Sequence, residues 1–187
     1  MVHLHEANLP DGSASNPAAL SQSGSFTVVA PDGLANLTVG GLVVIANGQP
    51  VGAGQSRITG LGNTLAITGY NPQTGEVTYT YTLTGNEAHA DGQGANSISE
   101  SIPVVATDTD GDSSSGSLDI NIVDDVPQAV NDLNPVSASE NHTVLTGSVL
   151  PNDTQGADRI PSGPITPGTY TGTYGTLVLQ ANGDYTY

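Results

Sequence analysis

The segment EVTYTYTLTG at residues 76–85 alternates between apolar and polar side chains over almost its whole length. Val77, Tyr79, Tyr81 and Leu83 occupy the odd positions, and threonine occupies the even positions from Thr78 to Thr84. Successive side chains of a β-strand point to opposite faces, so the pattern places bulky groups on one face and hydroxyl groups on the other. The segment therefore predicts a strand with one buried face and excludes an amphipathic helix.

Further apolar or alternating runs predict strands on both sides of this segment. Turn-forming residues separate them, because the chain contains 24 glycines and 12 prolines, and helical patterning is nearly absent. About seven short strands separated by turns are typical of an immunoglobulin-like β-sandwich. We therefore predict an all-β fold, with the additional strands at residues 25–30, 37–46, 57–69, 100–108 and 115–125.

A module boundary is predicted just after Asp125. Pro127 has no amide hydrogen and blocks further ladder pairing. The sequence thus predicts an immunoglobulin-like β-sandwich at residues 1–125 and a second β module at 126–187, with strands in 144–154, 171–180 and 184–187 and a two-residue hairpin turn at Asn182–Gly183. The second module is expected to be incomplete, because so short a remainder buries little core.

The charge balance restricts the partners of the chain. Asp and Glu number 18 against 2 arginines, which gives a formal net charge of −16 and makes nucleic acid and anionic membranes poor partners. Cations are the expected small partners. Cysteine is absent, so metal ions are the expected substitute for disulfides if the protein is secreted. Neither a signal peptide nor a long apolar stretch is present, so the protein is either cytosolic or a piece of a larger protein exported by another route. The lack of lysine and the acidic composition, rich in Gly, Ser, Thr and Asn, favour the second interpretation.

The sequence DTDGD at residues 108–112 is the strongest candidate for a metal site. Asp108, Asp110 and Asp112 alternate along the chain, and Gly111 allows a tight turn, so three carboxylates can converge. Two such charges about 5 Å apart repel by roughly 3 kcal/mol at an effective dielectric constant near 20. Calcium takes six to eight oxygen ligands and would relieve this repulsion. A solvated acidic turn is the alternative interpretation.

Other site chemistries are less well supported by the sequence. An EF-hand is excluded because Ser113 replaces the loop glycine and Asp119 stands where the final glutamate is required. His3 and His5 share a strand face without another soft ligand nearby, so zinc is not expected there. No nucleophile elbow and no aromatic-lined cleft for paired carboxylates is apparent, and we predict that the protein is not an enzyme.

Several segments resemble repeats of giant bacterial adhesins. ATDTDGDSSSGSLDINIVDDVPQAVND at residues 106–132 resembles the end of the tandem repeat of RTX-type adhesins known as the type I secretion target repeat. EANLPDGSASNPAAL at 6–20 resembles its start, and HADGQGANS at 89–97 its middle. NDLNPVSASENHTVLTGSVLPNDT and GTYGTLVLQANGDYTY, within residues 126–187, resemble the first part of a VCBS repeat.

The resemblance implies calcium at the junctions between modules. It places the DTDGD loop near the start of the chain, where Glu6 would complete its ligand shell. Asp124 and Asp125 would lie at the opposite pole, with the loop that carries His89 and Asp91 close by. Three residues of the second module, Asp132, Asn152 and Asp153, would reach the junction from the other side. An acidic linker and Asx turns are the alternative interpretations for Asp124–Asp125 and Asn152–Asp153.

The resemblance also implies a function. We expect a calcium-dependent spacer segment of a large adhesin, monomeric and extracellular on a bacterial cell surface, whose partners are calcium ions and neighbouring repeats of the same chain. A carbohydrate- or protein-binding β-sandwich module is the alternative. An exposed aromatic cluster near a calcium site would favour it, and Tyr170 and Tyr174 are the only residues that could begin such a cluster.

Overall fold

The computed structural model describes residues 1–90, 94–160 and 162–187. It confirms the predicted all-β fold class: the described residues form three sheets, and their only helical turns are two short 3-10 segments, η1 (Glu6–Asn8) and η2 (Pro17–Leu20). No helix in the described ranges is long and apolar enough to cross a membrane.

Two sheets form a sandwich that ends at Val123. The larger sheet has the order β1-β10-β9-β3-β4-β5, and the smaller has the order β2-β8-β7-β6. The strands are β1 (Val2–His5), β2 (Ser21–Thr27), β3 (Leu34–Val39), β4 (Leu42–Ala46), β5 (Gln49–Pro50), β6 (Gln55–Ile58), β7 (Thr64–Asn71), β8 (Glu76–Thr82), β9 (Ser97–Asp108) and β10 (Ser113–Val123).

The core lies between these two sheets, and β8 contributes to it as its sequence predicts. Val77, Tyr79 and Tyr81 of β8 and Leu83 just beyond it are each at most 2% exposed. Full burial of one such side chain contributes roughly 1.5–3 kcal/mol, so loss of any one of them would destabilise the sandwich. Side chains from the opposite sheet complete the core, among them Leu4, Leu37, Val39, Ile102, Leu118, Ile120 and Ile122.

The direction of β1 determines where Glu6 lies. β1 pairs in parallel with the end of β10, with His5 opposite Val123. Glu6 therefore leaves the sheet beside Asp124, whereas the DTDGD loop is at the other end of β10, about 35 Å away at roughly 3.3 Å per residue. The prediction that Glu6 completes the DTDGD ligand shell is wrong, because a parallel first strand carries the chain away from that hairpin.

The remaining strands form a separate sheet, here called the C-terminal sheet. It has the order β11-β14-β13-β12, with β11 (Thr146–Ser148), β12 (Gly168–Thr171), β13 (Thr176–Leu179) and β14 (Asp184–Thr186). The hairpin between β13 and β14 has three loop residues, 181–183, instead of the predicted two, and Gly183 adopts φ +86°. No large apolar side chain of this sheet is fully buried in the described part of the chain.

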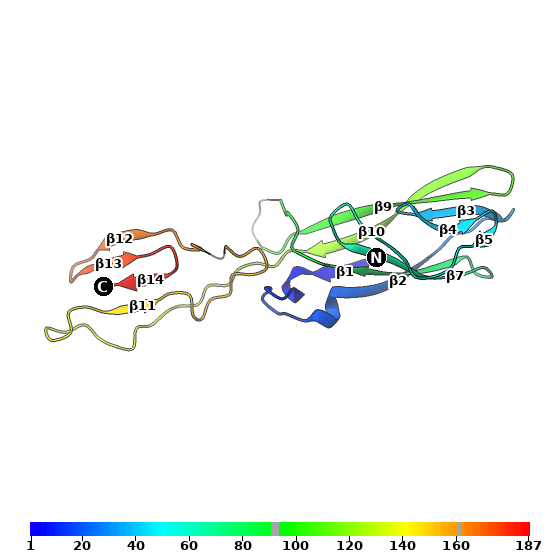
Figure 1. Cartoon of the computed structure of the whole chain (residues 1–187). Coiled ribbons are helices and arrows are strands. Elements are labelled where there is room, and N and C mark those ends of the chain that lie inside the picture. The colour runs from blue at the N-terminus through cyan, green and yellow to red at the C-terminus, as the bar shows by residue number, and fades with distance from the viewer. Residues whose placement is uncertain (91–93, 161) are drawn as a thin grey trace.

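Figure 1 shows the C-terminal sheet beyond one end of the sandwich and the β9–β10 hairpin tip at the other end. The chain crosses between the two parts at residues 124–128, and a bridge between Gln128 and Thr154 lies on the C-terminal side of this crossing. The molecule is therefore elongated, and its two predicted acidic sites lie at different places along its length.

Candidate metal centre

The end of the sandwich that faces the C-terminal sheet is here called the junction. Its first two acidic residues are brought together by strand register, because Glu6 follows β1 and Asp124 follows β10, the adjacent parallel strand. Glu6 is completely buried, and Asp124 is half-buried. A buried carboxylate is costly unless it is paired, hydrogen-bonded or bound to a metal.

The loop after β8 brings a third group to the same place. Asn63, itself fully buried, accepts a hydrogen bond from the Thr84 amide at 2.9 Å and donates its amide to Oε1 of Glu87 at 2.5 Å. The Glu87 amide then donates to Oε1 of Glu6 at 2.5 Å. These bonds fix the loop against the sandwich and place the imidazole of His89 over Glu6.

The His89 ring and Glu6 are both buried without their full complement of partners. The His89 side chain is 4% exposed, and its Nε2 lies 3.2 Å from Oε1 of Glu6. Neither ring nitrogen makes a hydrogen bond of acceptable geometry with any described residue, and the same is true of Oε2 of Glu6. One ligand atom from each of Glu6, His89 and Asp124 lies within 4.8 Å of the other two. We call these three residues the junction cluster.

The electrostatics of the junction favour a cation. Burial raises the pKa of Glu6, an effect that the Glu87 amide and His89 oppose and that the Asp158 carboxylate reinforces. Burial likewise raises the pKa of Glu87, against the hydrogen bond from Asn63. Both carboxylates are thus held where their charged forms are poorly solvated, and a positive ion beside them would offset this cost.

The segment between β11 and β12 of the C-terminal sheet contributes to the same region. Asp158 lines an open hollow together with Asn86, Glu87, His89 and Asp124. The Asn86 side-chain amide donates a hydrogen bond to Asp158, and Arg159 forms an ion pair with Asp11. Acidic groups from both sides of the junction therefore face one hollow.

Asp125 lies next to this cluster but uses its oxygens differently. Its carboxylate is 7% exposed and accepts hydrogen bonds from the Ser13 amide at 2.7 Å, the Ser13 hydroxyl and the Ala157 amide at 3.0 Å. It thereby joins the loop after η1 to the segment between β11 and β12 of the C-terminal sheet. Metal binding by Asp125 stays a prediction, whereas its role as a hydrogen-bonded connector is a direct observation.

The structure brings Asp108, Asp110 and Asp112 together at the β9–β10 tip, as their spacing predicts. One carboxylate oxygen from each lies within 4.8 Å of the others. Oδ1 of Asp108 accepts the amides of Gly111 at 3.0 Å and Asp112 at 2.9 Å. A hydrogen bond shared between Asp108 and Asp110 lowers the pKa of the former and raises that of the latter. The tip is solvent-exposed, so both the calcium site and the acidic turn stay open as interpretations.

The structure does not place Asn152 and Asp153 in the junction cluster. Asp153 accepts the Val130 amide at 2.7 Å, and the Asn152 side chain donates to the carbonyl groups of Val130 and Asn131. These bonds stabilise a turn beside the Gln128–Thr154 bridge. The expectation that these residues and Asp132 reach the junction is not met, and Asp158 lies there instead. Asp91 lies outside the described residues.

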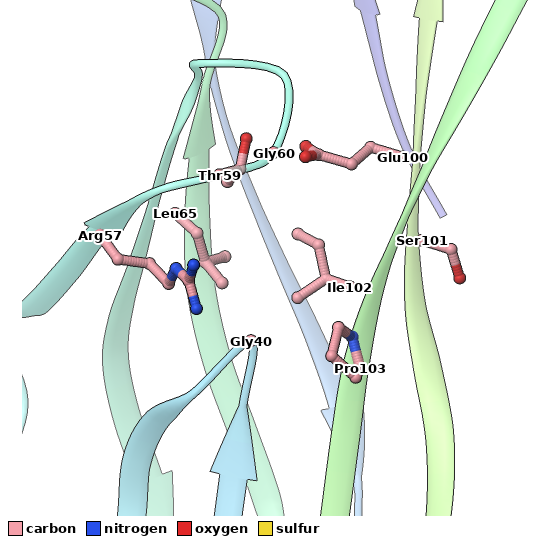
Figure 2. Close-up of a pocket in the computed structure, with 9 residues that line it drawn as sticks. All are labelled: Gly40, Arg57, Thr59, Gly60, Leu65, Glu100, Ser101, Ile102 and Pro103. Atoms are coloured by element: carbon pink, nitrogen blue, oxygen red, sulfur yellow. The ribbon is translucent and has the colours of Figure 1, made fainter.

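Figure 2 shows a separate pocket in the sandwich, whose walls are partly polar and partly apolar. It is lined by Gly40, Arg57, Thr59, Gly60, Leu65, Glu100, Ser101, Ile102 and Pro103. Its acidic group is already engaged, because Glu100 accepts the Tyr81 hydroxyl at 2.5 Å and the Leu61 amide at 3.0 Å. Burial, and then the bond to Glu100, raise the pKa of Tyr81 well above its usual range. The contacts of Glu100 thus assign it a structural role.

Tyr81→Phe is expected to lower the free energy of unfolding by about 1–3 kcal/mol, since it leaves a Glu100 oxygen without its donor. Tyr170→Phe makes the same chemical change at a side chain that is 55% exposed, and is expected to stay within about 0.5 kcal/mol of the parent. Urea denaturation of both variants measures the difference. Equal stabilities would contradict a structural role for the Tyr81–Glu100 bond.

Comparison with protein family models, curated proteins and solved structures found no match for this chain. Its fold and its candidate centres are therefore interpreted from the structure and the sequence alone.

Sequence reasoning missed two residues of the junction. Asp158 lies in a polar segment without a motif, and only the fold shows that this segment returns to the sandwich. The loop that carries His89 was expected close to Asp124, but His89 itself was assigned no role. Nothing in the sequence indicates that its ring is buried against Glu6.

Proposed function

We propose that the chain is a spacer segment of a large bacterial surface adhesin, in which cations bound by carboxylates stiffen the connection between modules. In its simplest form the cation is calcium, the most available divalent ion outside the cell that prefers oxygen ligands. The segment works as an extracellular monomer in line with its neighbouring repeats. This function is mechanical and requires no catalytic group.

The observation that carries the proposal is the hollow at the junction. Asp124 of the sandwich and Asp158 of the segment between β11 and β12 line it. Glu6 lies beside Asp124 in the junction cluster, and one of its oxygens is buried without a partner among the described residues. Without a cation the like charges repel and favour separation of the two parts. A bound cation reverses the sign of this interaction, because each carboxylate is then attracted to a common centre.

The hairpin tip offers the second cation position of the proposal. Asp108, Asp110 and Asp112 provide only oxygen ligands and remain exposed at the end of the sandwich that is remote from the C-terminal sheet. Calcium bound there would have coordination positions left for water or for carboxylates of a neighbouring module. Cations bound by carboxylates would thus stiffen the connections to neighbouring modules at both ends of the sandwich.

The carbohydrate- or protein-binding alternative has less support. Tyr170 is 55% exposed and Tyr174 is 94% exposed, so both are available to a ligand. They lie on β12 and in the turn that follows it, whereas both acidic clusters found among the described residues belong to the sandwich. The condition set for this function, aromatic side chains beside a calcium site, is therefore not met in this part of the chain.

The proposal predicts that calcium narrows the range of distances between the two parts. The chain has no cysteine, so spin labels can be attached at Val29→Cys in the sandwich and Tyr174→Cys in the C-terminal sheet, where the native side chains are 81% and 94% exposed. Electron–electron double resonance should give a broad distance distribution in chelator and a narrow one in millimolar calcium. A 100-fold excess of calcium over its dissociation constant should also stabilise the chain by about 2.7 kcal/mol.

Two variants that carry the same spin labels distinguish the effect of the junction cluster from that of the hairpin tip. Asp124→Asn should abolish the narrowing, because it weakens the junction cluster. The triple variant Asp108→Asn, Asp110→Asn and Asp112→Asn removes the same type of charge at the hairpin tip and should retain the narrowing while it loses thermal stabilisation. A distance distribution that stays equally broad in chelator and in the presence of any divalent cation tested would show that the spacer proposal is wrong.

A further inference from the structure

The junction cluster differs from the hairpin tip in one chemical respect: it contains an imidazole. Calcium and magnesium select oxygen ligands, which is what Asp108, Asp110 and Asp112 offer. Imidazole nitrogen is a ligand for zinc, copper, nickel and iron. The two clusters therefore present different donor sets, although both are acidic.

The burial of the cluster provides an observation that is independent of its charge. Three buried polar atoms of the cluster lack a hydrogen-bond partner among the described residues: Oε2 of Glu6 and both ring nitrogens of His89, of which Nε2 lies 3.2 Å from Oε1 of Glu6. Buried polar atoms in native proteins are nearly always paired, and each exception requires an explanation. A metal ion would satisfy an oxygen and a nitrogen at once.

The spacing of the donor atoms fits a small ion. Two ligands at 2.0–2.2 Å from a tetrahedral metal are about 3.4 Å apart, and Nε2 of His89 lies 3.2 Å from Oε1 of Glu6. The ligand atoms of all three residues lie within 4.8 Å of one another. To reach the tetrahedral spacing, the Asp124 oxygen therefore has to move toward the other two ligand atoms by an ångström or so at most. Asp124 is only half-buried and follows the end of β10, so this adjustment does not disturb the core.

We propose that Glu6, His89 and Asp124 form a binding site for a divalent transition-metal ion, with zinc as the preferred occupant. Asp158, on the wall of the same hollow, is the group available for a fourth position. This inference deepens the proposed function and rests on it in one respect, that a cation occupies the junction. It differs in the identity of the ion, because zinc and not calcium would connect the sandwich to the segment between β11 and β12.

The test is a zinc titration of the full chain after removal of its metals with chelator and of any histidine tag. Because the chain lacks cysteine and has 4 histidines, a tight zinc site must use an imidazole or carboxylates alone. Competition with a chromophoric chelator should show one zinc ion per chain, bound far more tightly than calcium. His89→Ala should weaken zinc binding by more than the roughly 10–100-fold that loss of an outer-shell partner costs.

His142→Ala is the matched control, since it removes an exposed imidazole remote from the cluster, and it should leave zinc affinity unchanged. Circular dichroism in chelator verifies that His89→Ala is folded. Should it unfold, cobalt substitution of the parent chain replaces it, and the visible spectrum of tetrahedral cobalt with a nitrogen ligand is expected. Zinc binding that survives His89→Ala in a folded chain, or that is no tighter than calcium binding, would overturn the inference.

The outcomes also separate this inference from the spacer proposal. If calcium narrows the Val29–Tyr174 distance distribution and zinc does not bind the cluster, the spacer proposal stands and the zinc site is refuted. If zinc binds through His89 but neither ion changes the distribution, the site is real and the mechanical function is refuted. If neither ion binds at the junction, both are wrong.

Discussion

Asp125→Ala is expected to lower the free energy of unfolding by about 1.5–3 kcal/mol, the usual contribution of hydrogen bonds to a charged group. The buried carboxylate accepts two hydrogen bonds from Ser13 and one from Ala157, all of them partly buried, so its removal leaves these donors without their acceptor. The substitution therefore removes hydrogen bonds on both sides of the junction, to the loop after η1 and to the segment that carries Ala157. Chemical denaturation monitored by tyrosine fluorescence measures it.

Asp132→Ala provides the control for Asp125→Ala, because it removes the same carboxylate from an exposed position that accepts no hydrogen bond from a described residue. Its effect is expected to stay within about 0.5 kcal/mol. Asp125→Asn should fall between the two, since it keeps one acceptor oxygen and loses the charge. If Asp125→Ala is no less stable than Asp132→Ala, the hydrogen bonds of Asp125 do not hold the junction together.

Glu6→Gln is expected to have opposite effects in chelator and in the presence of the junction cation. In chelator at neutral pH the variant should melt at a higher temperature than the parent, because it no longer buries a carboxylate whose charged form is poorly solvated. With the cation present the order should reverse, because the parent gains the free energy of ion binding and the amide binds the ion poorly. Differential scanning calorimetry under both conditions measures the sign change.

The pH dependence of the parent follows from the same buried group. Burial raises the pKa of Glu6 above its ordinary value of 4.5 in the folded chain, so the folded state binds more protons than the unfolded state at pH values above 4.5. In chelator, stability should therefore fall as the pH rises from 4.5 through the folded pKa and then level off. A bound cation should oppose this fall, because protons compete with it for the carboxylate.

Glu87 and Asp110 also have raised pKa values, so the parent alone does not isolate the contribution of Glu6. The difference between the parent and Glu6→Gln does isolate it, because the other groups are common to both chains. This difference should grow as the pH rises above 4.5. A difference that is constant with pH would contradict a raised pKa for Glu6.

The sandwich was predictable from local sequence because its strands alternate. Tyr79 and Tyr81 can be buried only if β8 is extended, and the turn at residues 72–75 follows from its composition. The DTDGD cluster was predictable for the same reason, since its three carboxylates are close in sequence. In both cases the residues that determine the local structure lie within a few positions of one another in the sequence.

The junction cluster was not predictable in this way, because it depends on the pairing of distant strands. Glu6 and Asp124 are neighbours only because β1 joins β10 in parallel, and the sequence of β1 is equally compatible with the opposite direction. His89 depends in addition on the anchoring of its loop by Asn63.

The parallel pairing of β1 and β10 also determines how the sandwich responds to a pulling force. Tension carried along the chain enters at the start of β1 and leaves at the end of β10, so the two adjacent strands are drawn in opposite directions along their common axis. Their hydrogen bonds lie across this axis and are loaded together in shear, whereas strands peeled from one end lose their bonds one at a time. The first module is therefore built to resist extension at the very pair of strands that positions Glu6 and Asp124.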